Sequence, residues 1–109
     1  MSNENRNFKQ DILAAAGDEP ILALKIISTL EYEYTNNPST DSRDSPELKA
    51  TIGKCISWAE AAPLLNYEFY AGFGGMDCHD IVFWTETKVF YIHEYDGSTS
   101  IQYVERNPQ

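Results

Sequence analysis

Residues 80–105, with the sequence DIVFWTETKVFYIHEYDGSTSIQYVE, decide the fold that this chain predicts. Apolar and aromatic residues alternate there with a period of two, as in strands that bury one face. The pattern breaks at Glu86 and Thr87 and again at Asp96 and Gly97, and Asp-Gly is a strong hairpin signal. The expected antiparallel strands run over about 80–85, 89–95 and 100–104.

The two turns also predict how these strands pair. A two-residue loop at the first turn pairs Phe83 with Phe90, and one at the second turn pairs Phe90 with Tyr103. Both loops place the same side chains on one face, an agreement that a slip of one residue would remove. The shared face contains Ile81, Phe83, Phe90, Ile92, Ile101 and Tyr103.

The opposite face of these strands is unusually apolar for a surface in water. It carries Val82, Trp84, Val89, Tyr91, Val104 and His93. One interpretation is a second layer, supplied by a helix or by a dimer partner. The other is a recognition surface, because Trp and Tyr are enriched at the centres of interfaces.

The first half of the chain predicts helices. Apolar spacing indicates a helix over Phe8–Ala16 that ends at Gly17, and a second over 21–34 behind an N-cap at Asp18. A third follows over 45–62, with Ser45 as N-cap and Pro63 as its end. The turn-rich segment 35–45 between them predicts a mobile surface loop, and a first strand is expected over 65–73.

These elements predict one domain over residues 1–109, with a helical half over 7–62 and a strand half over 64–105. The expected class is α+β, with N-terminal helices packed on one face of a C-terminal antiparallel sheet of three to four strands. Cys55 and Cys78 are too few for a disulfide framework, so we expect both to be buried thiols.

Seventeen acids against eight bases give a net charge of −9, which opposes direct contact with nucleic acid or anionic membranes and favours basic partners. The chain has no apolar run of the roughly 18 residues that cross a bilayer and no apolar leader, which favours a cytoplasmic location.

The acidic residues also suggest a contact surface. Between Lys54 and Lys88 there is no Lys or Arg, while acids continue through this region and along the strands, with aromatic residues among them. Such a surface could imitate phosphates and bases in a basic groove, although a plain solvated face has the same composition. The candidate partner-binding residues are Glu60, Glu68, Tyr70, Asp77, Asp80, Trp84, Glu86, Tyr91, Glu94 and Asp96.

The segment 77–80, Asp-Cys-His-Asp, together with His93, is the one cluster that suggests catalysis or a metal. Neighbouring residues of a strand point to opposite faces, so Cys78 and His79 are not expected to ligate one ion. The acids on either side also oppose a nucleophilic thiolate at Cys78. We therefore predict no catalytic residue, metal or cofactor, and keep a small metal-dependent enzyme as the alternative of another class.

Residues 78–108, CHDIVFWTETKVFYIHEYDGSTSIQYVERNP, resemble small acidic proteins of bacterial viruses. The resemblance rests on the WT strand, the EYDGST hairpin and the final RNP, and covers about the last third of the chain. It implies a phage protein that blocks a host defence enzyme, as anti-CRISPR proteins do.

The function expected from charge and resemblance together is therefore non-enzymatic inhibition. The partner would be a basic, nucleic-acid-binding host enzyme, such as a CRISPR effector or a restriction system, whose groove the protein occupies. An immunity protein that caps a toxic nuclease is the alternative with the same size and charge, and a homodimer stays open.

Overall fold

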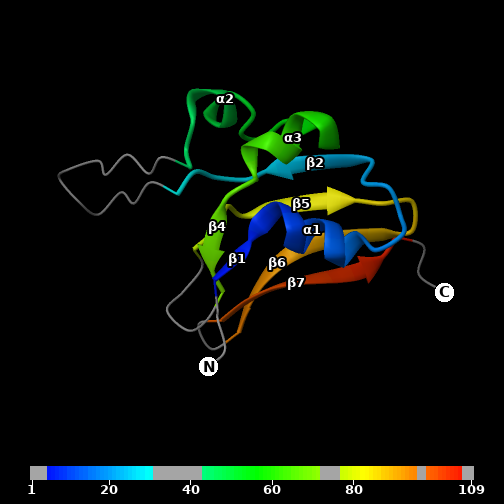
Figure 1. Ribbon diagram of the computed structural model, residues 1–109. Helices are drawn as coiled ribbons and strands as arrows, with labels where there is room; N and C mark the ends of the chain where they lie inside the picture. The colour runs from blue at the N-terminus through cyan, green and yellow to red at the C-terminus, as the bar shows by residue number, and fades with distance from the viewer. Residues whose placement is uncertain (1–4, 31–42, 72–76, 96–97, 107–109) are drawn as a thin grey trace.

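A five-stranded antiparallel sheet with the strand order β3-β2-β5-β6-β7 forms the body of the protein (Figure 1). The computed structural model describes residues 5–30, 43–71, 77–95 and 98–106. The strands are β2 (Ala23–Ile26), β3 (Cys55–Ile56), β5 (Ile81–Trp84), β6 (Lys88–Tyr95) and β7 (Ser98–Glu105). Two further strands, β1 (Asn5–Asn7) and β4 (Glu68–Tyr70), pair antiparallel with each other beside this sheet. The α+β class and the antiparallel sheet are thus confirmed, and strands make up more of the fold than expected.

The predicted register of the last three strands is confirmed. Phe83 lies opposite Phe90, and Phe90 lies opposite Tyr103. The first turn is closed by the backbone N–H of Thr85, which donates to the carbonyl of Lys88 at 3.0 Å. Phe83 and Phe90 stack with ring centroids 4.5 Å apart, so the pairing also positions the two rings at the centre of the core.

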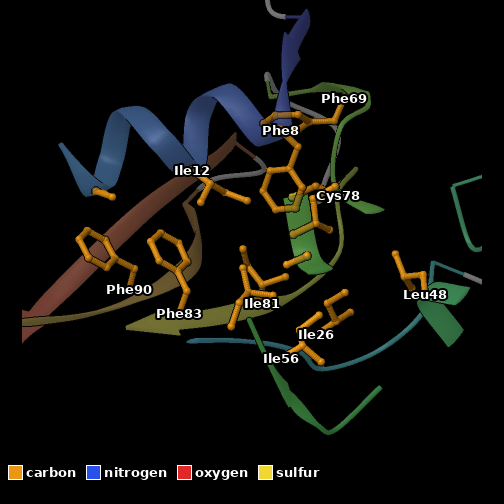
Figure 2. Packing of buried hydrophobic residues seen from close by; sticks show 14 of the residues in the cluster. Phe8, Ile12, Ile26, Leu48, Ile56, Phe69, Cys78, Ile81, Phe83 and Phe90 are labelled. Atoms are coloured by element: carbon orange, nitrogen blue, oxygen red, sulfur yellow. The ribbon is translucent and has the colours of Figure 1, made fainter. Parts of the chain in front are cut away.

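Helix α1 (Phe8–Ala16) is confirmed with the predicted bounds. The Asn7 side chain accepts the backbone N–H of Gln10 and caps its start, and Gly17 ends it at φ 65°, where glycine is favoured. Phe8 and Ile12 are fully buried and point toward the sheet, on the side of Phe83 and Phe90 (Figure 2). The expected cover of this face by an N-terminal helix is therefore present.

The helix predicted over 21–34 is wrong, because β2 lies there and residues 27–30 are not helical. Leu24 and Ile26 are buried while Ala23 and Lys25 are half-buried, so the segment also satisfies a period of two. Short apolar runs fit either structure, and pairing of β2 with β5 decides in favour of the strand. Residues 31–34 lie outside the described part.

The helix predicted over 45–62 is also wrong and is replaced by three elements. These are α2 (Pro46–Lys49), β3 and α3 (Trp58–Leu64). Ser45 caps α2 as predicted, but Gly53 adopts φ 78° and its N–H donates to the carbonyl of Ile26 at 2.9 Å. Ser57 then caps a new helix, which continues one residue past Pro63 instead of ending before it.

The strand predicted over 65–73 and the surface loop predicted over 35–45 agree with the structure only in part. Along the strand predicted over 65–73, Leu65, Phe69 and Ala71 are buried, but only Glu68–Tyr70 forms a strand, and Phe73 lies outside the described residues. Residues 35–42 of the predicted surface loop lie outside the described part. Residues 43–45 form neither helix nor strand, but Asp44 among them is buried and not on the surface.

The exposure of Tyr103 and of one cysteine differs from what the sequence predicts. Tyr103 points to the α1 side of the sheet as predicted, yet it is 53 % exposed because it lies beyond the helix cover. Cys78 is buried as expected, but Cys55 is exposed, and both are free thiols. No helix in the described part of the chain is long and apolar enough to cross a membrane.

Candidate functional site

The face of the sheet turned away from α1 remains open. Antiparallel register places its side chains in cross-strand rows, because residues paired across strands point to the same side. The first row contains Ala23, Trp84, Val89 and Val104, the second Lys25, Val82, Tyr91 and Gln102, and the third His93 and Ser100. We call these ten residues the open face.

The buried side chains of the helices all belong to the opposite side. Ile12 of α1, Leu48 of α2 and Ala61 of α3 join one core cluster with Phe83 and Phe90. No helix of the described ranges therefore covers the open face. On it, Tyr91 is 38 % and Val104 53 % exposed, while Val82, Trp84 and Val89 are half-buried. The predicted apolar face is thus confirmed, and nothing in the described part of this chain supplies a second layer.

Four of the ten predicted contact residues lie on or beside the open face. Trp84 and Tyr91 belong to its rows, and Glu86 lies in the turn between β5 and β6. Asp80 directly precedes β5, and its carbonyl accepts the N–H of Ile27 at 2.8 Å, which continues the pairing of β2 with β5. Acids therefore stand at both ends of an apolar and aromatic centre.

The other predicted contact residues lie elsewhere. Glu60 is on α3, Glu68 and Tyr70 are on β4, and all three are exposed. Glu94 is exposed near the end of β6, but strand alternation directs it to the α1 side. Asp96 lies outside the described residues. The ten residues consequently do not form one continuous surface.

Asp77, which lies in the stretch without Lys or Arg, has a cationic partner from another part of the chain. An Arg43 Nη lies 3.0 Å from its Oδ1, and a second donates to its carbonyl at 2.7 Å. The other Asp77 oxygen accepts the N–H of Tyr70 at 2.9 Å. Outside the predicted set, Glu19 is paired in the same way, with Lys88 at 2.8 Å. The stretch without basic residues is therefore partly neutralised in space by Arg43, which comes from a distant segment.

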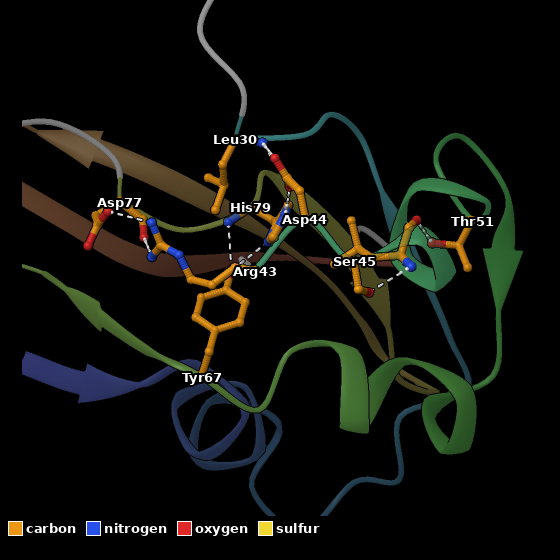
Figure 3. A network of polar contacts seen from close by, with 9 residues as sticks. Leu30, Arg43, Asp44, Ser45, Thr51, Tyr67, Asp77 and His79 are labelled. Carbon is orange, nitrogen blue, oxygen red and sulfur yellow. Dashed lines mark hydrogen bonds and ion pairs between the residues drawn. The ribbon is translucent and has the colours of Figure 1, made fainter. Parts of the chain in front are cut away.

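A buried polar network, which the sequence did not indicate, lies next to the Arg43–Asp77 pair (Figure 3). His79 is fully buried, with Nε2 2.7 Å from Oδ1 of Asp44 and Nδ1 2.7 Å from the Tyr67 hydroxyl. Both Asp44 oxygens accept the backbone N–H of Leu30 at 3.0 Å. The network thus joins residues that are far apart in the sequence.

The Tyr67 oxygen accepts the backbone N–H of His79 at 2.9 Å and also lies within hydrogen-bond distance of Nδ1. In the tautomer with its proton on Nε2, the imidazole donates to Asp44 and Nδ1 accepts the Tyr67 hydroxyl. This hydroxyl–imidazole–carboxylate order is also found in hydrolytic triads. Here the imidazole and carboxylate are shielded from solvent, and the network joins four segments of the chain, at Leu30, Asp44, Tyr67 and His79.

Two of its members could not be found from the sequence. Asp44 stands in a turn-rich polar stretch that is typical of a surface loop, and Tyr67 follows the alternation of an ordinary strand. For His79, the sequence suggests only a metal ligand or a member of a catalytic cluster. A buried partner for it has no local signal, because Asp44 is 35 residues away.

The segment 77–80 does not assemble a reactive centre with His93. Burial raises the pKa of the Cys78 thiol to about 12, with a smaller contribution from the Asp77 charge, which disfavours the thiolate. His93 is exposed on the open face, whereas His79 is buried. Within the described ranges, no three His, Cys, Asp or Glu side chains are placed to hold a metal ion.

Comparison with known proteins finds no family model, no curated protein and no solved structure that matches this chain.

Proposed function

We propose that this protein is a non-enzymatic inhibitor that docks its open face on a basic, nucleic-acid-binding host enzyme and blocks that enzyme's groove. The observation that carries the proposal is the open face itself: a strand face with Trp84, Tyr91 and Val104 that no described element covers. The proposal concerns an enzyme of the CRISPR-effector or restriction type.

The composition of the open face favours contact with a macromolecule over exposure to water. Contiguous apolar surface on a soluble chain marks interaction sites, whereas isolated apolar side chains do not. Here Trp84, Val89 and Val104 are adjacent across three strands, and Tyr91 lies in the next row. Aromatic side chains of this kind form the energetically dominant centres of interfaces.

The charge of the chain favours a basic partner. The net charge of −9 attracts positive surfaces and speeds their association, and it disfavours a second copy that carries the same charge. Asp80 and Glu86 add negative charge at the two ends of the open face, although Lys25 lies within it. The negative charge therefore determines which partners are attracted, while the apolar centre forms the part of the interface that is buried on binding.

This arrangement favours blocking a groove over close imitation of nucleic acid. Imitation requires a regular series of unpaired carboxylates, and Asp77 is paired with Arg43 while Glu60 and Glu68 lie on other elements. We accordingly place the contact at the aromatic rows and treat the acids as their rim.

The test measures cleavage of a labelled DNA duplex by purified RNA-guided nucleases and restriction endonucleases, with and without this protein. For an enzyme that is inhibited, Tyr91→Ser should weaken inhibition by about tenfold or more, as loss of a central aromatic contact does. Tyr70→Ser is the matched control, because Tyr70 is similarly exposed at 42 % but lies on β4.

The salt dependence completes the test. Raising the ionic strength should weaken inhibition chiefly by slowing association, since exposed charges are screened beyond about 8 Å at physiological salt. Absence of inhibition across the panel, or equal loss with both tyrosine variants, would contradict the proposal. A dimer that forms through the open face would identify a second copy as its occupant instead.

A further inference from the structure

Among the described residues, the backbone N–H and C=O groups along the outer edge of β7 have no partner in the sheet over Ile101 and Tyr103. The N–H of Thr99 donates to the carbonyl of Ala71 at 3.1 Å, so it points away from β6. The N–H of Arg106 donates to the carbonyl of Thr87 at 2.8 Å, so it points across the hairpin. Because these directions alternate along an antiparallel strand, the N–H and C=O groups of Ile101 and Tyr103 point outward, away from β6.

This edge lacks the features that usually protect exposed strands. Natural edges carry inward charges, prolines, bulges or a covering segment. From Ser100 to Val104 the sequence SIQYV has no charge and no proline, and its pairing with β6 is continuous. In the described part of the chain, nothing hydrogen-bonds to the outward groups of Ile101 and Tyr103, and β7 forms the outer strand of the sheet (Figure 1).

A cavity of about 340 Å³ lies beside this edge, between α1 and β7. Its walls include Asp11 and Ala15 from α1, Ile92 from β6, and Thr99 and Ile101 from β7. Thr99 is only 7 % exposed, and its hydroxyl has no hydrogen-bond partner among the described residues. A buried hydroxyl without a partner is unfavourable, so a group that enters the cavity and bonds to it would be stabilised.

We propose that the β7 edge binds an extended basic peptide segment as an additional strand, with one large side chain of that segment in the cavity. Residues paired across two strands point to the same face, and Ile101 points to the α1 side. The peptide residue opposite Ile101 therefore points to the side on which the cavity lies. Backbone hydrogen bonds then provide affinity and the cavity provides selectivity, as in other strand-addition sites.

The occupant follows from charge and size. A second copy of this chain would bring another −9, whereas a basic segment is attracted. Arg6 and Asp11 both line the cavity and form an ion pair at 3.7 Å, in which burial raises the pKa of the Asp11 carboxyl and Arg6 opposes that shift. The cavity thus combines apolar walls with an ion pair and a hydroxyl that is unpartnered within the described ranges, which fits a large side chain with an apolar body and a polar tip, such as tyrosine, between lysines. This site goes beyond the proposed inhibition, because it uses the edge of the sheet and not the open face.

The experiment uses fluorescence anisotropy of a labelled peptide, Lys-Leu-Lys-Tyr-Lys-Leu-Lys, with the full chain. Two N-methylated versions of this peptide have the same charge. In each version the methyl groups block every second amide, so that one version blocks one edge of the extended strand and the other version blocks the opposite edge. We expect one version to bind like the parent and the other to bind about tenfold or more weakly, since only one side pairs with β7.

Variants of the protein then locate the site. Tyr103→Pro removes an outward N–H and leaves the hydrogen bonds to β6 in place, so it should weaken peptide binding about as much as the N-methylation that blocks pairing with β7. Tyr103→Thr, the control, keeps this N–H and should not weaken binding. Ile101→Trp, which fills the cavity, should weaken binding of the parent peptide, and Tyr91→Ser on the open face should leave it unchanged. The last variant separates failure of this site from failure of the proposed inhibition.

Two results would overturn the inference. Equal binding of both N-methylated peptides would show that attraction between charges alone holds the peptide. A stable dimer that Tyr103→Pro abolishes and Tyr103→Thr preserves would show that a second copy occupies the edge. Chemical denaturation of each variant checks that the fold is retained.

Discussion

The Nε2 atom of His79 lies 2.7 Å from Oδ1 of Asp44, and the two side chains are 0 % and 1 % exposed. Asp44→Ala leaves the buried imidazole without its partner and the N–H of Leu30 without its acceptor. We expect the free energy of unfolding to fall by about 3 kcal/mol or more, as for other broken buried pairs. Urea denaturation measures the change.

The control for this prediction is Asp77→Asn. The Asp77 side chain is 43 % exposed, so its ion pair with Arg43 is weakened by solvent and the loss should stay below about 1 kcal/mol. Equal losses for Asp44→Ala and Asp77→Asn would contradict a structural role for the buried network.

The substitution Gly53→Ala distinguishes the observed fold from a continuous helix over 45–62, because the free energy of unfolding should change in opposite directions in the two cases. In a continuous helix, Gly53→Ala would raise the free energy of unfolding by about 1 kcal/mol. At the observed φ of 78° it should instead lower it by about 1–2 kcal/mol, because a Cβ strains this backbone conformation. Lys54→Ala, an exposed neighbour, should change it by less than about 0.5 kcal/mol.

The two thiols should react at very different rates. Cys55 is exposed, whereas Cys78 is buried and burial raises its pKa to about 12, so its thiolate is scarce at pH 8. A disulfide reagent should titrate one thiol per native chain and the second only after denaturation. In Cys55→Ser the rapid reaction should disappear, and a fast thiol in that variant would contradict the burial of Cys78.

The lowered pKa of the Glu19 carboxyl predicts that the stability of the fold depends on pH in the acidic range. Hydrogen bonds from Lys88 and then Thr87 lower the pKa of its carboxyl from 4.5 to about 2. Its contribution to stability is therefore complete above the unfolded pKa near 4.5 and is lost as the pH falls through the folded pKa near 2. NMR titration of the Glu19 carboxyl should give a midpoint near 2, and Lys88→Met should move it upward. A midpoint that Lys88→Met leaves in place would exclude this cause.

The open face could be predicted from the sequence because its evidence is local. Turn residues 86 and 87 and the Asp96 and Gly97 signal set the register, and register determines which side chains share a face. The sequence therefore places Trp84, Tyr91 and Val104 on the same face without knowledge of the remaining fold. That they stay uncovered could not be predicted, because it depends on where every helix packs.

The sequence by itself determined α1 with its end at Gly17, the last three strands and their pairing, since period and turn chemistry act over a few residues. Only the tertiary structure decided that residues 23–26 form a strand. Their apolar run fits a helix equally well, but as a strand they form backbone hydrogen bonds with β5 that a helix could not form. It alone brought Arg43 to Asp77 and Asp44 to His79, across 34 and 35 residues. Long-range pairs of this kind leave no periodic trace in a single chain, because each partner is selected by position in space and not by its neighbours in sequence.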